Sequence, residues 1–388
     1  MTTVRNLRAI SDRFNEVIEE FPVYRSKDVP FSWRSVKEIN ADAVFHSDRR
    51  TRFQQGEIGN CWLAAAIESL RQESNQEAYN EVVQVNGSEL EFSFWHPGPH
   101  RRSIKLDSDA VPTRDGALVF IHNVEDNEYW GILLEKAYAK WVGSYEGLEG
   151  GFWTDAIQSF TGGVVERIKL GKDSMPDNLF DIMLTSFQNG SDLCCIKKDP
   201  RDTEKYHSCC INIMKIEEDN RKIWVLDPQS QDCNVWTYEE FINEYHRLDM
   251  CHKNLDNLSG LQGRNIGSSP WVSQTFCLEL ENLCDEFTIE LNDTDDDQEG
   301  CTFVVELVQK IKPDDEDKLN CIKPWDALVD LELKVGDEEF ATKYPQETHC
   351  FTMQPGTSDI RVTTDTEEHG SIYMRISSKR KYEVKRKE

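Results

Sequence analysis

Residues 55–70 read QGEIGNCWLAAAIESL, and this stretch decides the fold. From Cys61 onward, apolar residues recur at spacings of three and four, which predicts a helix that begins at Cys61. The preceding turn supplies an N-cap at Asn60. The Cys61 sulfur would then lie near the free N–H groups and the positive end of the helix dipole, where a thiolate is stabilised.

Gln55 lies upstream of Cys61 across the same turn, and its side-chain amide would point to the same space as the Cys61 backbone N–H. Together these donors would form an oxyanion hole, which stabilises the tetrahedral intermediate of acyl transfer. The plain alternative is that Cys61 is an ordinary buried cysteine, because unpaired cysteines are among the most buried residues. The turn and the upstream Gln55 favour the catalytic interpretation.

A thiolate nucleophile is usually served by a histidine base, and His207 is the candidate. It opens an alternating strand at 208–216, which a charged turn joins to a second strand at 222–226 that ends at Asp227. An antiparallel hairpin would bring His207 and Asp227 to the same open end, where the carboxylate can orient the imidazole. A hydrogen-bonded surface histidine and an Asp-Pro turn are the plain alternative.

The spacing of apolar residues divides the chain into three regions. Helical patterns cover 129–142 and 154–160, short strand-like runs follow Gly163, and a β-rich regime follows residue 267. This order indicates a helical lobe, a stranded lobe and a β-sandwich of about a hundred residues. The basic tail is expected to be disordered.

The chain has 388 residues, with 44 Lys and Arg against 71 Asp and Glu, a net charge of −27 that argues against nucleic acid as a partner. Twelve irregularly spaced cysteines favour a reduced, cytoplasmic protein. No apolar run suggests a signal peptide or a transmembrane segment. A metal site built from Cys194, Cys195, Cys209, Cys210 and His207 is a weaker alternative, because adjacent strand residues point to opposite faces.

Several motifs are recognisable in their order. The first half contains QGEIGNCW (55–62), NEYWGILLEKAYAKWVGSYEGLEGG (127–151) and FTGGV (160–164). Together they resemble the protease core of the calpains, papain-like cysteine endopeptidases of the cytoplasm. FTIELNDTDDDQEGCTFVVELVQK (287–310) and GSIYMRISSK (370–379) are similar to the family's C2-like domain. The resemblance spans roughly residues 30 to 380 and leaves no sequence for the family's EF-hand domain.

The resemblance implies an α+β fold in which a two-lobed papain-like cysteine protease core is followed by an antiparallel β-sandwich, the C2-like domain. The expected order is an N-terminal extension over 1–30, a helical lobe with the nucleophile over 31–165, a β-rich lobe with the His and Asp over 166–262, the C2-like domain over 268–380 and a basic tail over 381–388.

By the same resemblance, Cys61 is the nucleophile, Gln55 an oxyanion donor and His207 the general base. Gly150 and Gly151 fall where the family holds substrate backbone, although glycines needed only to turn the chain would look the same. The family's third catalytic residue is an Asn in an Asn-Pro-Trp-Gly run, where this chain has Asp227-Pro228-Gln229-Ser230. An Asp can also orient an imidazole, so this difference permits activity. Gln229 replaces the family's Trp, which shields or blocks the active-site cleft, so access to the cleft must be controlled differently here.

The family's protease core binds two calcium ions, and this sequence matches both sites poorly. Glu128 is present for the first site, but its partner position holds Arg52 instead of an Asp, and the two could form an ion pair. The second site looks deleted. Nine Asp or Glu and no Lys or Arg lie between Glu281 and Glu299; this acidic loop could bind calcium weakly, dock on a basic surface of the protein, or stay solvated.

We therefore expect a cytoplasmic cysteine endopeptidase acting on protein or peptide substrates, with no required cofactor and calcium as a possible ligand. The alternative is a catalytically impaired homologue that serves as a protein-binding scaffold, as Asp227, Gln229 and the lost calcium ligands suggest. No small-subunit partner is implied by EF-hands. Recruitment to a membrane surface through the C2-like domain is conceivable.

Overall fold

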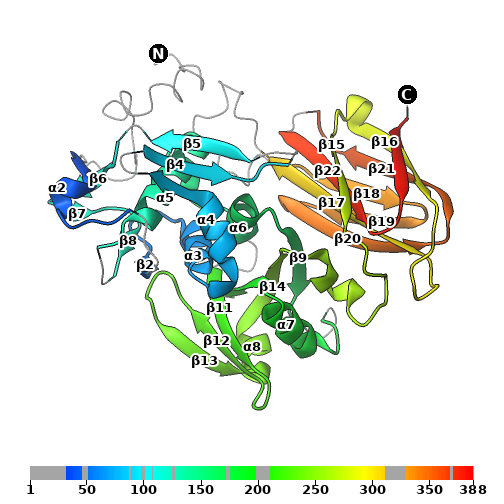
Figure 1. Cartoon of the computed structure of the whole chain (residues 1–388), viewed down its shortest axis with the longest axis horizontal. Coiled ribbons are helices and arrows are strands. Elements are labelled where there is room, and N and C mark those ends of the chain that lie inside the picture. The colour runs from blue at the N-terminus through cyan, green and yellow to red at the C-terminus, as the bar shows by residue number, and fades with distance from the viewer. Residues whose placement is uncertain are drawn as a thin grey trace.

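The structure is a computed structural model and describes residues 32–45, 51–86, 89–97, 101–106, 108–124, 127–171, 175–197, 210–310, 328–367 and 370–387. His207 and Cys209 lie outside these ranges. The described elements form three groups with a large hydrophobic core each: a helix-rich part, a six-stranded sheet with helices, and a β-rich part at the right of Figure 1.

Helix α3 (Cys61–Leu70) is the central element of the first core. Every residue of α3 after Cys61 is buried, which explains why its sequence is apolar on nearly all sides. Helix α5 (Trp130–Val142) ends at Gly143, whose φ of 105° lies in the left-handed region that glycine adopts without strain. The remaining helices here are α2 (Val36–Ile39), α4 (Gln76–Val82) and α6 (Trp153–Thr161).

Three small antiparallel sheets complete the first part, and the expectation of a purely helical first half was therefore incomplete. These strands are two to six residues long, too short for alternation to stand out in the sequence. They pair as β1 (Ser32–Ser35) with β6 (Ala110–Arg114) and β7 (Ala117–Leu118), β2 (Phe53–Gln54) with β8 (His122–Asn123), and β3 (Val83–Asn86) with β4 (Glu89–Phe94) and β5 (Arg102–Leu106).

The second part is a six-stranded antiparallel sheet in the order β13-β12-β11-β10-β14-β9. The expected hairpin is confirmed: Asn212 lies opposite Leu226 and Ile213 opposite Val225. Helix α7 (Leu179–Gln188) was missed by the sequence analysis; α8 (Tyr238–Glu244) begins with a Thr237–Glu240 capping box. The strands are β9 (Val164–Lys169), β10 (Asp192–Lys197), β11 (Cys210–Glu217), β12 (Lys222–Leu226), β13 (Cys233–Thr237) and β14 (Tyr245–His252).

The third part consists of two antiparallel sheets with a shared apolar core. Alternate residues are buried in β16, as in Phe287, Ile289 and Leu291, whereas β17 is buried along nearly its whole length. One sheet has β15 (Val272–Cys277), β22 (Ser371–Ser378), β17 (Cys301–Lys310) and β20 (Gln346–Met353); the other has β19 (Glu338–Thr342), β18 (Leu331–Val335), β21 (Gly356–Thr364), β16 (Cys284–Leu291) and β23 (Tyr382–Arg386).

The expectation of a disordered basic tail was wrong, because β23 lies within it and pairs with β16. Tyr382 is buried, and its hydroxyl lies within hydrogen-bonding distance of the carbonyls of Ile376 (2.8 Å) and Val272 (3.1 Å), which share its one O–H. Arg386 forms ion pairs with carboxylates of the same sandwich. The many Lys and Arg residues of the tail masked the sequence signal of this short strand, which the buried ring of Tyr382 anchors to the sandwich.

Glu306 of β17 joins the sandwich to the first part. Its buried carboxylate accepts a hydrogen bond from Gln158 of α6 at 2.8 Å and pairs with Arg375 of β22 at 2.6 Å. Because α6 packs directly against α3, the sandwich is attached one helix away from Cys61.

Candidate active site

Cys61 is the first residue of α3 and the only partly exposed residue of that helix. The Asn60 carbonyl accepts the N–H groups of Leu63 and Ala64 at 2.9 and 3.0 Å, which begins the helix directly behind Cys61. The Asn60 side chain makes no capping bond to the helix. Asn60 is thus the N-cap by position, as expected, while its side chain is used elsewhere.

The Asn60 side chain instead donates to Glu135 of α5 at 2.7 Å. Glu135 is buried and also accepts the Ile121 N–H at 3.1 Å. Burial raises the pKa of Glu135 to about 8, so this carboxyl group is mainly neutral at pH 7. The sequence analysis missed Glu135; the signal was a glutamate among the apolar positions of the predicted helix at 129–142.

Gln55 is held within the turn that precedes Cys61. Its side-chain Nε2 donates to the Ile58 carbonyl at 2.7 Å, and its backbone N–H donates to the Pro228 carbonyl at 3.0 Å. The next residue, Gly56, has no room for a side chain, because a Cβ would lie 2.2 Å from the Phe120 carbonyl oxygen. The glycine therefore allows the chain to approach this closely.

Gly150 and Gly151 pass along the start of α3. The Gly150 N–H donates to the Gly59 carbonyl at 2.8 Å, and its φ of 77° favours glycine. A Cβ on Gly151 would meet the Trp62 ring at 2.5 Å, and the Trp62 indole donates to the Leu148 carbonyl at 3.0 Å. Both glycines are thus required by the local backbone, next to the Cys61 turn, whether or not they also contact a substrate.

Asp227 follows β12 and stabilises a tight turn. Its Oδ1 accepts the N–H groups of Gln229 (2.7 Å) and Ser230 (3.4 Å), and its carbonyl accepts the Gln231 N–H at 2.8 Å. The turn-forming alternative for Asp227 therefore describes one of its roles. The pairing of Asp227 with His207 stays a prediction, because His207 lies outside the described residues.

The turn 227–231 docks on β2, which leads into the Cys61 turn. Besides the Gln55–Pro228 bond, Gln54 Nε2 donates to the Gln229 carbonyl at 2.9 Å and Gln231 Nε2 to the Phe53 carbonyl at 2.8 Å. Three hydrogen bonds thus connect the first and second parts at this point. They bring together the segments that carry Cys61, Gln55 and Asp227.

The position expected to bind a metal is occupied by backbone and by an arginine. Residues 51–53 run between two buried carboxylates: the Thr51 N–H donates to Glu128 at 2.9 Å, and the Phe53 N–H donates to Glu68. Burial raises the pKa of Glu68; Arg71, which pairs with it at 2.8 Å, opposes that shift most strongly, and the positive charge of Arg52 adds to this. The cationic Arg52 does not fit a calcium site, which needs oxygen ligands. The expected Arg52–Glu128 ion pair stays a prediction.

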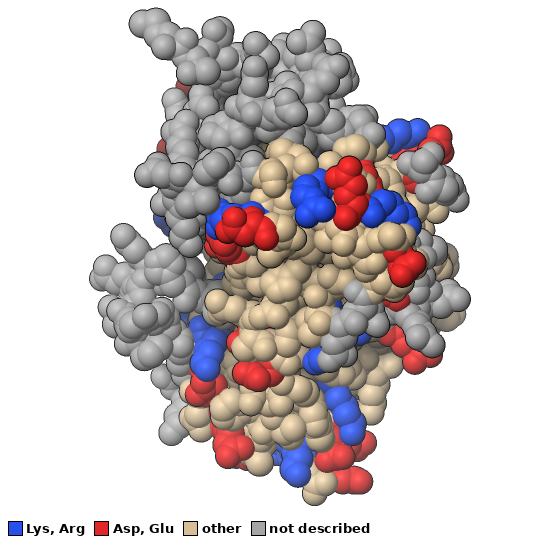
Figure 2. Space-filling view, turned by 90° about the vertical axis from the view of Figure 1, so that its left-hand side faces the viewer, with Lys and Arg blue, Asp and Glu red and all other residues tan. Residues whose placement is uncertain are grey.

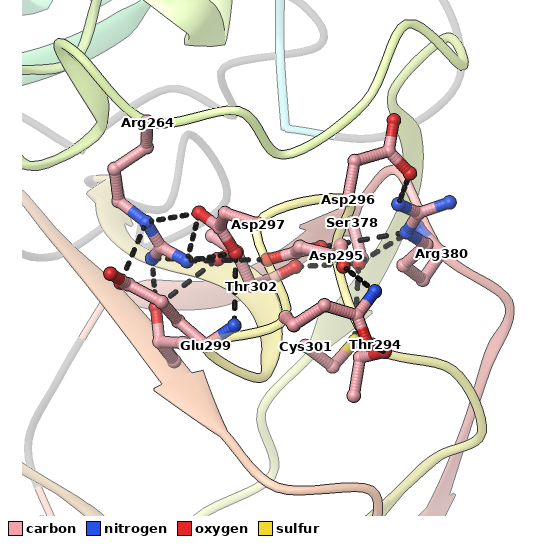
Figure 3. A network of polar contacts seen from close by, with 12 residues as sticks. Arg264, Thr294, Asp295, Asp296, Asp297, Glu299, Cys301, Thr302, Ser378 and Arg380 are labelled. Atoms are coloured by element: carbon pink, nitrogen blue, oxygen red, sulfur yellow. Dashed lines mark hydrogen bonds and ion pairs between the residues drawn. The ribbon is translucent and has the colours of Figure 1, made fainter.

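The acidic loop of the sandwich contacts two arginines (Figure 3). Asp297 pairs with Arg264 at 3.0 Å, and Asp296 pairs with Arg380 at 2.5 Å. Asp295 is buried between the two guanidinium groups at 3.6 and 3.5 Å. Of the alternatives for this loop, docking on basic side chains of the same chain is confirmed for these residues.

The face that carries β2 and β8 is largely uncharged across the middle of its described surface, with Lys, Arg, Asp and Glu above and below (Figure 2). Among the described residues, none of the helices is long and apolar enough to span a membrane. In the same residues, three or more His, Cys, Asp or Glu are nowhere grouped so as to hold a metal ion.

The described site thus has a cysteine at the start of a buried helix, a glutamine in the preceding turn, and a strand-end carboxylate whose turn docks on that segment. Residues 16–216 match the model of the calpain family cysteine protease. The chain therefore belongs to the calpain family.

Individual calpains are similar along much of this chain. The calpain-2 catalytic subunit of Homo sapiens is 31% identical over 367 residues, covering 75% of this chain and 51% of that protein. Calpain-A of Drosophila melanogaster is 32% identical over 368 residues, covering 75% and 44%. The calpain-1 catalytic subunit of Rattus norvegicus is 30% identical over 360 residues, covering 74% and 49%. The chain spans about half the length of these curated relatives.

Proposed function

We propose that this chain is a cytoplasmic cysteine endopeptidase that hydrolyses peptide bonds of protein substrates. Its core would be papain-like, with one lobe over 31–165 and the other over 166–262, followed by a C2-like domain over 268–380. The observation that carries the proposal is the 3.0 Å hydrogen bond from the Gln55 N–H to the Pro228 carbonyl. This bond ties the Cys61 turn to the turn that Asp227 stabilises.

In this proposal the Cys61 thiolate attacks the peptide carbonyl carbon, and His207 protonates the leaving amine. Asp227 orients the imidazole through the oxygen that does not serve the 227–231 turn. Gln55 Nε2 carries two hydrogens, and its bond to the Ile58 carbonyl fixes the amide while leaving one N–H for the oxyanion. The Cys61 backbone N–H is the second oxyanion donor, and water then releases the acyl-enzyme.

We further propose that calcium is not required to bring the two lobes together. Gln54, Gln55 and Gln231 already supply hydrogen bonds between them. Asn212 of β11 adds a fourth, from its Nδ2 to the Ala65 carbonyl of α3 at 2.7 Å. Arg52 replaces a carboxylate at the first family site. At the second family calcium site, the chain passes from the Asp227 turn directly into β13, so the segment that would form this site is absent between them.

The alternative function, a protein-binding scaffold, is favoured by one observation: the Asp227 carboxylate already accepts two turn N–H groups. Labelling with a thiol-directed epoxide separates the two functions. For the enzyme, we expect labelling that persists in a calcium chelator and disappears in Cys61→Ala. Cys277→Ala is the matched control, because Cys277 is an exposed thiol on β15 of the sandwich that should not affect active-site labelling.

Casein cleavage measured with and without calcium is the direct test of activity. We expect weak proteolysis that is lost in Cys61→Ser and changes little with calcium. Absence of both epoxide labelling and casein cleavage, in a folded protein, would support the scaffold. Cleavage that depends strictly on calcium would contradict the role given to Arg52.

A further inference from the structure

A second cysteine lies next to Cys61, on the opposite side of the junction between the two parts. Cys61, Ala65 and Ser69 are four residues apart and share one face of α3. That face packs on β11, where Asn212 donates to the Ala65 carbonyl at 2.7 Å and contacts the Ser69 hydroxyl at 3.4 Å. Cys210 precedes Asn212 by two residues and points to the same side of β11.

Because α3 packs against β11, the side chains of these residues lie near one another. The Cys210 thiol interacts with the side chains of both Cys61 and Cys194. Cys194 lies on the neighbouring strand β10, where it pairs with Asn212. Cys194 and Cys210 are buried, whereas Cys61 is partly exposed, and all three are thiols in this structure. A row of thiols thus leads inward from the candidate nucleophile.

We propose that Cys210 is a resolving cysteine for Cys61: a hydroperoxide oxidises Cys61, and Cys210 then closes a reversible disulfide that blocks the active site. This inference rests on the proposed function, because it needs Cys61 as a reactive thiolate. It assigns Cys210 as a site of modification and a hydroperoxide as the oxidant.

The chemistry balances in two steps. The Cys61 thiolate attacks one peroxide oxygen, the O–O bond breaks, hydroxide leaves and Cys61 becomes a sulfenic acid. The Cys210 sulfur then attacks the Cys61 sulfur, the S–O bond breaks, and the oxygen leaves as water with the proton of Cys210. With the proton that Cys61 gives up on ionisation, which converts the hydroxide to water, the two thiols lose two electrons and two protons. Hydrogen peroxide is thereby reduced to two molecules of water, whereas an alkyl hydroperoxide would give one alcohol and one water. A dithiol reductant reverses the reaction by disulfide exchange.

The different burial of the three thiols determines which of them is oxidised first. The hydrogen bond with Cys194 and burial raise the pKa of Cys210, and burial raises the pKa of Cys194 to about 11. Both therefore stay protonated near neutral pH and react slowly with peroxide, because the thiolate is the reactive form. Cys61 is the accessible thiol and is oxidised first. Cys210 interacts with Cys61, whereas Cys194 interacts with Cys210 from the neighbouring strand, so Cys210 is the partner.

The closing experiment is peptide mass spectrometry of the whole chain after brief treatment with hydrogen peroxide, quenching and alkylation without reductant. We expect a peptide pair linked through Cys61 and Cys210 that disappears with dithiothreitol. In Cys210→Ser, Cys61 should instead be found as sulfenic acid, trapped by dimedone, and at higher dose as sulfinic or sulfonic acid. Cys194→Ser is the matched control and should still form the linked peptides.

Activity gives a second readout. After treatment at the higher dose, dithiothreitol should restore roughly half or more of wild-type cleavage but less than about a tenth in Cys210→Ser, because overoxidised cysteine is not reduced by thiols. Irreversible oxidation of wild-type Cys61 with no Cys61–Cys210 peptide, or a Cys194–Cys210 link in its place, would overturn the proposal. Linked peptides in a protein that cleaves nothing would uphold the disulfide and reject the protease instead. If Cys210→Ser misfolds, the wild-type spectrum still decides.

Discussion

The side-chain amide of Asn60 donates a hydrogen bond to the buried carboxyl group of Glu135, 2.7 Å away. Asn60 immediately precedes Cys61, so a buried acid on α5 helps to fix where α3 begins. Because burial raises the pKa of Glu135 to about 8, this support depends on a proton at neutral pH. The position of the candidate nucleophile is thus coupled to the ionisation of a buried group on a neighbouring helix.

Glu135→Gln should remove a pH dependence from the free energy of unfolding. Between the ordinary pKa of 4.5 and about 8, the folded protein holds a proton that the unfolded chain has released, so rising pH destabilises the wild type. The loss is on the order of 4 kcal/mol across this window. A glutamine amide keeps the shape without titrating. Denaturant unfolding at pH 5 and pH 8 should therefore show Glu135→Gln gaining stability relative to wild type as pH rises.

Glu77→Gln is the matched control for that measurement, since Glu77 is exposed on α4. Its difference from wild type should stay constant between the two pH values. Equal pH dependence in wild type and Glu135→Gln would show that Glu135 is ionised in the folded protein.

Gly151→Ala should destabilise the protein, because a Cβ would lie 2.5 Å from the Trp62 ring at the start of α3. Overpacking of this kind costs about 1–3 kcal/mol. Gly59→Ala is the control from the same region, where the nearest atom would be Glu149 Cγ at an ordinary 3.6 Å. Thermal unfolding of both variants checks the prediction, and equal midpoints would contradict it.

The elements around Cys61 could be predicted because their signals are local. The turn at 55–60, the helix from Cys61 to Leu70 and the 210–226 hairpin each carry a periodic pattern or a turn signal within a few residues. Glu135 and the docking of Gln231 on Phe53 could not be predicted in this way. Such contacts join residues 75 and 178 positions apart in sequence, and periodicity carries no information on which distant segments meet.

Composition also concealed structure. The strand at Tyr382–Arg386 lies in a run of Lys and Arg, and this high charge led to a prediction of disorder. In the structure, Tyr382 is buried against the sandwich. Cys210 was considered for a metal site because it adjoins Cys209. Its contact with Cys61 depends on which face of β11 meets α3, and only the packed structure provides that information.

Asp227→Asn and Asp227→Ala should separate the turn role of Asp227 from its proposed catalytic role. An asparagine oxygen can still accept the Gln229 N–H, so Asp227→Asn should fold like wild type. Asp227→Ala loses that bond, at about 1 kcal/mol of stability. If Asp227 orients His207, kcat/KM should fall roughly 10²-fold or more in Asp227→Ala and far less in Asp227→Asn.

The pH–rate profile of Asp227→Asn supplies a readout that a purely structural role would not change. A carboxylate stabilises imidazolium more than an amide does, so the alkaline limb should move to lower pH in Asp227→Asn. A pH–rate profile identical to that of wild type would show that Asp227 only stabilises the turn.

Arg52→Asp should make the stability of the chain depend on calcium. It would replace the positive charge that now acts on Glu68 by a carboxylate, next to Thr51, whose N–H binds Glu128, and calcium would offset the added repulsion. Thermal midpoints in calcium and in chelator should agree within roughly 1 °C for wild type and differ by several degrees for Arg52→Asp. Lys334→Asp makes the same charge change on an exposed strand of the sandwich and should show no calcium effect.

The basic tail should not bind anionic membranes, because its cations Arg386 and Lys387 are paired with carboxylates of the same chain. Arg386 pairs with Glu279 at 2.5 Å and with Asp285 at 3.2 Å, and Lys387 pairs with Asp359 at 2.9 Å. The net charge of −27 adds repulsion from anionic lipid. Sedimentation with phosphatidylserine vesicles at physiological salt should leave the protein in the supernatant. Co-sedimentation that Lys387→Gln weakens, with Lys334→Gln as the control, would show that the tail charges are available to lipid after all.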